Sequence, residues 1–407
     1  AMVDAVRRTK SSIKQLFIPG MLFENMGLTY LGPVDGHNMR QMMRLFNEAK
    51  RVKGPVVVHV LTEKGRGYEP ARQNPDMFHG IGPFDIKTGK PTQKKVCPGY
   101  TDVFADALCQ VAAEEEKLVA ITAAMPDGTG LKKFSQRFPD RFFDVGIAEE
   151  HAVSFAAGLA LGGVVPVVAI YSSFLQRAVD QMLHDVCMQK LHVIFAVDRA
   201  GLVGADGETH QGNFDISYLS MMPGMTVMAP KNDWELKEML RFAVKADGPV
   251  AIRYPRGNAY QGLQEYQTAV EMGKSEVLHS GCKVAVLALG SMVAAADNVR
   301  NSLMAEGYTV TLVNARFVKP IDKDMIDAVC QNHKLIVTLE ENVSSGGFGR
   351  TVCQYVSDSE YNTHVLSISL PDDYIEHGSV DILRRETGID EESVIKRIKE
   401  SYTKIRE

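Results

Sequence analysis

The sequence predicts an α/β protein of three segments, in which parallel sheets are covered by helices on both faces. Apolar, β-branched runs of strand length recur along the 407 residues and alternate with helical stretches. Strands that are apolar without interruption are typical of parallel sheets buried on both sides. The clearest runs are residues 56–61, 118–122, 164–170, 193–197, 249–252, 284–289 and 335–339.

Two polar stretches that contain glycine divide the chain. Residues 87–100 and 257–274 are weakly periodic, and they separate segments 1–96, 97–262 and 263–407. The first segment offers one convincing strand, at 56–61, and one amphipathic helix, at 37–50. That is too little for an independent α/β domain, so we expect it to be the remnant of a larger domain.

Composition excludes several classes of function. The net charge of -5 gives no general attraction to nucleic acid, and 45% hydrophobic residues fit an ordinary globular protein. The 6 cysteines show no C-x-x-C spacing, which favours a reducing, cytoplasmic setting. Residues 152–171 carry no charge, but Gly162-Gly163 and Pro166 break them into a helix and a strand, so we do not expect a membrane span.

A pair of glutamates stands at the predicted start of a helix. Glu149 and Glu150 end the block at 142–151 and precede a stretch rich in Ala, Val, Phe and Gly. A carboxylate in such a wall loses solvation, so we expect Glu149 either to bind a proton more readily or to be held by a partner. It could then hydrogen-bond a heterocyclic nitrogen. Taken alone, the pair is better explained as acids that favour the helix dipole.

Three residues just after the strand at 164–170 favour a ligand site. Tyr171, Phe174 and Arg177 are spaced so that a helical start gathers two aromatic rings and a guanidinium. Open α/β sheets bind ligands at such carboxyl ends. Either ring alone could be ordinary core, but that alternative explains Arg177 less well.

A glycine-rich loop at 198–212 follows the strand at 193–197. It carries Arg199, Asp206 and His210, which can bind phosphate, hold a hydroxyl and exchange a proton, respectively. Loops at strand ends carry function more often than packing. For His210 by itself, an ordinary surface histidine is the more common explanation.

Basic residues also follow two other strands. Arg256 comes after the strand at 249–252, where a guanidinium can present its planar fork to a phosphate or form a surface ion pair. Lys64 follows the strand at 56–61 beside two glycines that allow close approach of an anion, and His79 lies on the succeeding loop. Alone, this glycine-rich turn is a weak signal.

Together these blocks resemble the 1-deoxy-D-xylulose-5-phosphate synthase family of thiamine diphosphate enzymes. The resemblance covers essentially the whole chain, and its order and spacing differ from those of transketolases and pyruvate dehydrogenase beta subunits. It implies a transketolase-like fold and a transferase that joins pyruvate to D-glyceraldehyde 3-phosphate with release of CO₂, for isoprenoid and thiamine biosynthesis. The blocks are residues 32–37, 64–70, 142–151, 171–177, 198–212 and 253–257.

The resemblance also implies roles for single residues. Glu149 would contact N1′ of the aminopyrimidine and so promote loss of the thiazolium C2 proton, and Phe174 would stack on the pyrimidine ring. Tyr171, Arg177 and Lys64 would shape the cofactor site. The remaining roles concern the aldehyde: Arg199 and Arg256, with Tyr171, would grip its phosphate, and Asp206, His210 and His79 would contact its hydroxyls or carbonyl and relay protons.

One departure from the family pattern is marked. The family holds the diphosphate and Mg²⁺ with a Gly-Asp-Gly motif followed by an asparagine, and no Gly-Asp-Gly occurs in this sequence. The resemblance is therefore to the carboxy-terminal two-thirds of the synthase, without the metal ligands. We expect a homodimer that is inactive alone and needs a companion amino-terminal chain.

Two alternatives stay open. One is the beta half of another thiamine diphosphate enzyme, a ketoacid dehydrogenase or a split transketolase, although Arg199 with Arg256 favours a phosphorylated acceptor. The other is a non-catalytic scaffold that has lost the cofactor.

Overall fold

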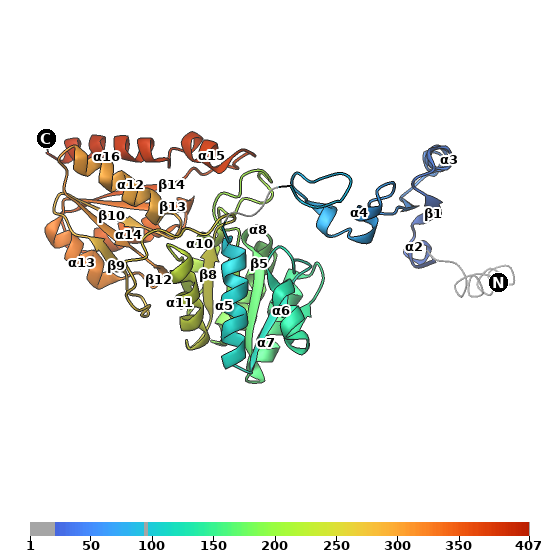
Figure 1. The fold of residues 1–407 in the computed structure, drawn as a ribbon, viewed down its shortest axis with the longest axis horizontal. Helices are drawn as coiled ribbons and strands as arrows, with labels where there is room; N and C mark the ends of the chain where they lie inside the picture. The colour runs from blue at the N-terminus through green and yellow to red at the C-terminus, as the bar shows by residue number, and fades with distance from the viewer. Residues whose placement is uncertain (1–20, 93–96, 407) are drawn as a thin grey trace. The chain divides into compact units, whose positions relative to one another are not determined.

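The computed structural model describes residues 21–92 and 97–406 of a chain that divides into two compact units, 1–96 and 97–407 (Figure 1). In the first unit, two parallel strands pair with each other. Its elements are α2 (Met21–Asn25), β1 (Thr29–Asp35), α3 (Met39–Ala49), β2 (Val56–Leu61) and α4 (Glu69–Gln73), followed by a 3-10 turn (Met77–His79).

The helix expected at 37–50 is confirmed as α3, and Asn38 caps it by accepting a hydrogen bond from the Gln41 N–H at 3.1 Å. The expectation of a single strand in this segment was wrong, because β1 also forms. Gly32-Pro33 interrupts β1, and its register with β2 shifts between Leu31 and Val34. Proline cannot donate to a strand ladder, which is why β1 was not recognised as a strand.

The second unit contains a seven-stranded sheet of order β12-β7-β8-β6-β5-β3-β4. Neighbouring strands are parallel except at the edge, where β12 pairs with β7 in the antiparallel direction. The strands are β3 (Leu118–Thr122), β4 (Phe142–Asp144), β5 (Val165–Tyr171), β6 (Ile194–Asp198), β7 (Thr226–Met228), β8 (Val250–Tyr254) and β12 (Phe317–Lys319).

Helices cover both faces of this sheet, as expected. In β6, Ile194 and Ala196 join the core beneath α5 and α11, whereas Phe195 and Val197 join the core beneath α7. Alternate residues of one strand are therefore buried on opposite faces. The helices are α5 (Tyr100–Glu114), α6 (Leu131–Arg137), α7 (Glu149–Leu161), α8 (Ser172–Leu175), α9 (Val179–Gln181), α10 (Asp215–Ser220) and α11 (Asp233–Val244), with a π-helix at Met182–Cys187 and 3-10 turns at Pro139–Arg141 and Gln176–Ala178.

A second sheet of five strands has the order β14-β13-β10-β11-β9, and its strands are parallel except β9. The predicted parallel sheets are thus confirmed apart from the antiparallel edges β9 and β12. The strands are β9 (Glu276–His279), β10 (Val284–Ala288), β11 (Val310–Asn314), β13 (Leu335–Val343) and β14 (His364–Leu370); the helices are α12 (Met292–Ala305), α13 (Lys323–Asn332), α14 (Phe348–Ser357), α15 (Val380–Glu386) and α16 (Glu391–Arg406).

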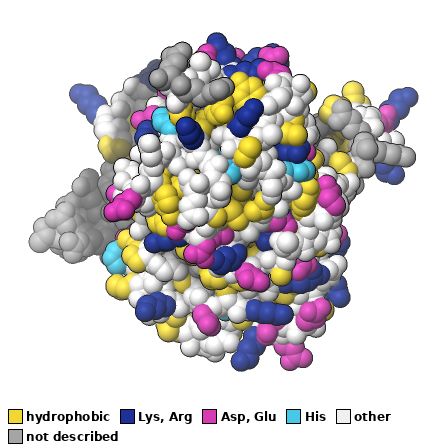
Figure 2. Space-filling model, turned by 90° about the vertical axis from the view of Figure 1, so that its left-hand side faces the viewer, with side chains coloured by type: hydrophobic (Ala, Val, Ile, Leu, Met, Phe, Trp, Pro, Cys, Tyr) yellow, Lys and Arg dark blue, Asp and Glu magenta, His cyan; other side chains and the backbone are white. Residues whose placement is uncertain are grey.

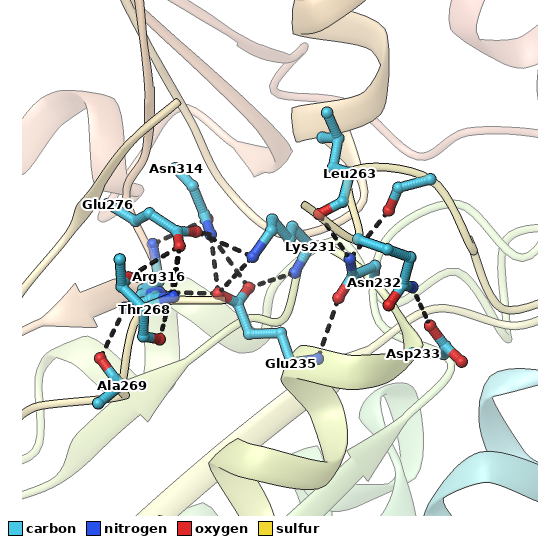
Figure 3. A network of polar contacts seen from close by, with 12 residues as sticks. Lys231, Asn232, Asp233, Glu235, Leu263, Thr268, Ala269, Glu276, Asn314 and Arg316 are labelled. Carbon is cyan, nitrogen blue, oxygen red and sulfur yellow. Dashed lines mark hydrogen bonds and ion pairs between the residues drawn. The ribbon is translucent and has the colours of Figure 1, made fainter. Parts of the chain in front are cut away.

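A buried ion cluster joins the two sheets (Figure 3). Lys231 Nζ lies 3.1 Å from Glu235 Oε1 and 2.9 Å from Glu276 Oε2. Arg316 Nε donates to Glu235 Oε1 at 2.7 Å, and Asn314 donates to the same carboxylate. All five side chains are buried. Two cations offset two carboxylates, so the contact between the sheets is held by groups whose charges cancel.

Strand β13 runs four residues beyond the predicted end at 339. Glu340, Glu341 and Asn342 are buried within it. The Glu340 carboxylate accepts hydrogen bonds from the Phe348 and Gly349 N–H groups at 2.9 and 2.7 Å, at the start of α14. Burial raises the pKa of Glu340 to about 7 despite these donors. The prediction ended the strand where the apolar run ends, but the hydrogen-bond partners of the acidic residues let the strand continue.

The part of the chain that the structure describes has no helix of sufficient length and apolar character to cross a membrane. Basic and acidic side chains are interspersed over the face shown in Figure 2. All six cysteines carry free thiols.

Candidate functional site

The buried acid predicted at 149 opens helix α7. Glu149 is only 2% exposed, whereas Glu150 is exposed. Arg177 donates to Glu149 Oε1 at 2.5 Å. The expectation that Glu149 is shielded and held by a partner is therefore confirmed, and the partner is a guanidinium.

Two aromatic rings lie next to this ion pair. The rings of Tyr171 and Phe174 are stacked, with centroids 5.6 Å apart and planes inclined by 22°. The guanidinium carbon of Arg177 lies 5.3 Å from the Phe174 centroid, and His210 approaches the same ring edge-on at 5.2 Å. Tyr171 ends β5 and Phe174 lies on α8, so the helical turn gathers these side chains as the spacing predicted.

Arg199 is held in place from three sides. Its guanidinium carbon lies 3.7 Å from the centroid of Tyr171, and it donates to the Gly128 carbonyl at 2.8 Å. It also pairs with Asp198 at 3.2 Å. The backbone φ of Arg199 is +61°, a left-handed conformation that costs energy in a residue other than glycine. Strain of this kind gathers at functional sites.

Asp198 is a residue that the sequence argument did not single out. It ends β6, is fully buried, and accepts a hydrogen bond from Thr101 Oγ1 at 2.9 Å. Burial raises its pKa to about 6, against the opposing effect of Arg199. Its place at a strand end directly before Arg199 was the signal available in the sequence. Asp198 fixes the position of the Arg199 guanidinium.

The two arginines at the end of β8 differ in environment. Arg253 is buried and donates to both carboxylate oxygens of Asp215, at 2.7 and 3.2 Å. Arg256 instead pairs with Asp206 at 2.5 Å, and both of these side chains are about two-fifths exposed, at 42% and 41%. Arg256 is therefore the arginine that a ligand can reach.

Tyr171 connects the aromatic pair with the charged groups. Burial raises the pKa of its hydroxyl, and the charges of Arg199, Asp198, Arg256 and Asp206 also act on it. Of these groups, Arg199 contacts the Tyr171 ring directly.

The other two predicted residues belong to the first unit. Lys64 Nζ lies 2.9 Å from His79 Nδ1, so these side chains contact each other as neighbours. Within that unit, Lys64 follows β2 as predicted.

The residues present fit the pyrimidine half of thiamine diphosphate. Glu149 offers a shielded carboxylate, and Phe174 with Tyr171 offers a flat aromatic surface. For a metal, the described residues contain no group of three or more His, Cys, Asp or Glu side chains able to hold one. The fit therefore extends to the ring and not to the metal-bound diphosphate.

Three family models match the sequence. The transketolase pyrimidine-binding domain matches residues 98–261, and the transketolase C-terminal domain matches residues 273–394. A 1-deoxy-D-xylulose-5-phosphate synthase model matches residues 1–62.

Curated relatives agree with these matches. The chain is 53% identical over 399 residues to a 1-deoxy-D-xylulose-5-phosphate synthase of Lachnoclostridium phytofermentans, covering 98% of this chain and 64% of the relative. It is 51% identical over 393 residues to a synthase of Clostridium tetani, covering 97% and 63%. The chain thus spans less than two-thirds of the length of these relatives.

Solved structures show the same fold. A split-gene transketolase, described as an inactive beta4 tetramer, matches with a TM-score of 0.68 and 28% identity, covering 75% of this chain and 98% of that one. A transketolase from Campylobacter jejuni matches with a TM-score of 0.63 and 16% identity, covering 95% and 70%. On these sequence matches and this fold, the chain belongs to the 1-deoxy-D-xylulose-5-phosphate synthase family of transketolase-like proteins.

Proposed function

We propose that this chain carries the pyrimidine and aldehyde-phosphate half of a thiamine diphosphate-dependent 1-deoxy-D-xylulose-5-phosphate synthase. The reaction joins pyruvate to D-glyceraldehyde 3-phosphate and releases CO₂, the first step of the methylerythritol phosphate route to isoprenoids. The observation that carries the proposal is Glu149, buried and paired with Arg177 beside the stacked rings of Phe174 and Tyr171. The names of the relatives support the choice of reaction.

The cofactor, when bound, supplies the electron sink for decarboxylation. Glu149 would hold the aminopyrimidine through a hydrogen bond to its ring nitrogen, and Phe174 would stack on that ring. Arg177 contacts both Glu149 and Phe174, so it would hold the carboxylate in position beside that ring. Mg²⁺ and the diphosphate would be held by the Gly-Asp-Gly part of the complete enzyme, with Lys64 nearby.

The phosphate of the aldehyde would bind Arg199 and Arg256. Each now pairs with a carboxylate, Asp198 or Asp206, and a phosphate dianion would compete for the exposed donors of these guanidinium groups. Binding a remote phosphate provides energy that positions the reacting carbonyl. The phosphate would thus orient the aldehyde toward the cofactor.

Proton transfer would fall to the groups near the aldehyde. His210 lies against Phe174, and Asp206 belongs to the same loop, so both would contact substrate hydroxyls or the carbonyl. His79, beside Lys64, would join them in the complete enzyme. We propose a cytoplasmic homodimer that acts with a companion amino-terminal chain.

An activity measurement on this chain, alone and mixed with a companion chain, tests the proposal. The chain alone should release no CO₂ from pyruvate with D-glyceraldehyde 3-phosphate, thiamine diphosphate and Mg²⁺, and addition of a companion chain that carries Gly-Asp-Gly should restore release. A mixture that stays inactive, although the two chains form a complex, counts against the proposal. The inactive split-gene transketolase tetramer offers a structural precedent for a half enzyme of this kind.

The same precedent favours a second candidate, the beta half of a split transketolase. That enzyme would transfer a ketol group between sugar phosphates and would not decarboxylate pyruvate. Release of CO₂ from pyruvate by the mixture separates the two, and comparison of phosphorylated with unphosphorylated aldehyde acceptors separates both from a ketoacid dehydrogenase. Binding of neither cofactor nor aldehyde phosphate by the mixture would indicate a non-catalytic scaffold.

A further inference from the structure

The loop at 199–212 is closed at its base. The Gly201 N–H donates to the Gly212 carbonyl at 2.7 Å, and the Gly212 N–H donates back to the Gly201 carbonyl at 2.8 Å. Arg199 contacts Tyr171 from one end of this loop, and His210 contacts Phe174 from the other. Whatever fixes the loop therefore also fixes side chains at the proposed aldehyde site.

The far side of this loop lies against the segment between β14 and α15. A Cβ on Gly204 would be 2.9 Å from the Gly378 carbonyl oxygen, and one on Gly207 would be 3.2 Å from the Cβ of His377. The Gly378 N–H donates to the Gly204 carbonyl at 3.3 Å. These glycines thus allow two backbone segments to touch.

A third contact lies nearer to the sheet. A Cβ on Gly201 would be 2.7 Å from Glu341 Oε2. Arg384, on α15, and Ser291 both donate to the Glu341 carboxylate, at 2.8 and 2.9 Å. The surface against which the loop packs is therefore itself held in place.

Gln211 joins the loop to this surface through both ends of its amide. The side chain is 2% exposed. Its Oε1 accepts from the Val203 N–H at 2.7 Å and, more weakly, from the Gly204 N–H at 3.4 Å. Its Nε2 donates to the Glu376 carbonyl at 3.1 Å and to the Ile375 carbonyl at 3.5 Å. One buried side chain thus satisfies polar groups of both segments.

We propose that Gln211 is a positioning residue, through which the carboxy-terminal domain holds His210 and Asp206 at the aldehyde site. The link to the aldehyde rests on the proposed function, whereas the link between the segments does not. We call the hydrogen bonds of the Gln211 amide to both segments the bridge. Ile375, at the far end of the bridge, is buried in the same hydrophobic core as Leu202, so the bridge connects the loop to a packed part of the domain.

Two substitutions in the full chain test the bridge. Gln211→Met removes both halves of the amide at similar volume. Gln211→Glu can still accept from the Val203 and Gly204 N–H groups but cannot donate to the carbonyls of residues 375 and 376. Both variants should exchange the loop amides about tenfold faster than the wild type in hydrogen–deuterium exchange. Gln189→Met, which removes an exposed amide bonded to the Asp185 carbonyl, is the control and should exchange as the wild type does. Wild-type exchange in Gln211→Glu would overturn the bridge.

The affinity for the aldehyde shows whether Gln211 positions the site residues or only stabilises the fold. By titration calorimetry, D-glyceraldehyde 3-phosphate should bind both Gln211 variants about tenfold more weakly than the wild type, with Gln189→Met unchanged. In the completed enzyme, the KM for this aldehyde should rise while the KM for pyruvate stays constant. Equal affinity in wild type and Gln211→Met would refute positioning. A wild type that does not bind the aldehyde phosphate would refute the proposed function, and amide exchange, which needs no ligand, would still accept or reject the bridge.

Discussion

Removal of Lys231 from the buried ion cluster should destabilise the second unit strongly. In Lys231→Met, the carboxylates of Glu235 and Glu276 lose the ammonium that lies 3.1 and 2.9 Å from them, and Arg316 alone remains to offset two charges. One uncompensated charge then stays buried between the sheets. Breaking a buried ion pair in this way costs about 3–5 kcal/mol, which is a large part of the stability of an ordinary domain.

The chain contains a built-in probe for this measurement. Its 1 tryptophan is Trp234, and Lys231 Nζ lies 5.3 Å from the centroid of that ring. Tryptophan fluorescence during urea unfolding therefore reports on the cluster itself. Lys237→Met is the matched control, since Lys237 makes a partly exposed pair with Asp233 at 3.5 Å on the same helix and should lose only about 0.5 kcal/mol. If Lys231→Met unfolds at the same urea concentration as Lys237→Met, the cluster does not hold the sheets together as described.

Three further predictions concern the candidate site and its support. Arg199→Met should weaken the binding of D-glyceraldehyde 3-phosphate about tenfold or more, measured by calorimetry, because charged hydrogen bonds to the phosphate are lost. The binding of unphosphorylated D-glyceraldehyde should stay unchanged, and equal losses for both ligands would contradict a phosphate role. Gly128→Ala places a Cβ 1.6 Å from the Tyr171 hydroxyl oxygen and 2.7 Å from its ring carbon Cζ, so it should cost about 1–3 kcal/mol in urea unfolding. Adding Tyr171→Phe removes the shorter contact and should recover part of this loss; no recovery would contradict the clash. The pKa of Glu340 is raised from 4.5 to about 7, so the folded state binds this proton more tightly than the unfolded state, and the resulting stabilisation is lost as the pH rises from about 4.5 to about 7. Glu340→Gln should therefore reduce the difference in stability between pH 5 and pH 8, measured by urea unfolding. The same difference in the variant and the wild type would show that another group causes the decline.

The sequence was most informative where local pattern and burial agree. The strand at 118–122 and the helix at 37–50 follow from apolar periodicity, and the gathering of Tyr171, Phe174 and Arg177 follows from helical spacing at a strand end. These features depend on residues close together in the chain. Local rules describe such features well.

Features that depend on distant partners could not be predicted. The acids of β13 lie in a strand because α14 and α15 supply their donors, and no local pattern reveals that. Likewise, Arg253 and Arg256 are three residues apart, yet Arg253 is a buried structural residue because the Asp215 carboxylate and the Glu341 carbonyl accept its hydrogen bonds. The glycines of the loop at 199–212 predicted a loop, but no local pattern indicated that Gly204 and Gly207 allow close packing against residues 377–378.

The proposed contact of Glu149 with the cofactor can be tested directly. In a mixture of this chain with its companion, exchange of the thiazolium C2 proton of thiamine diphosphate can be followed by proton NMR. Glu149→Gln should slow that exchange about 100-fold or more, whereas Glu150→Gln, a change at the exposed neighbour, should leave it at the wild-type rate. Equal exchange rates in Glu149→Gln and the wild type would contradict the assignment of this buried acid to the pyrimidine ring.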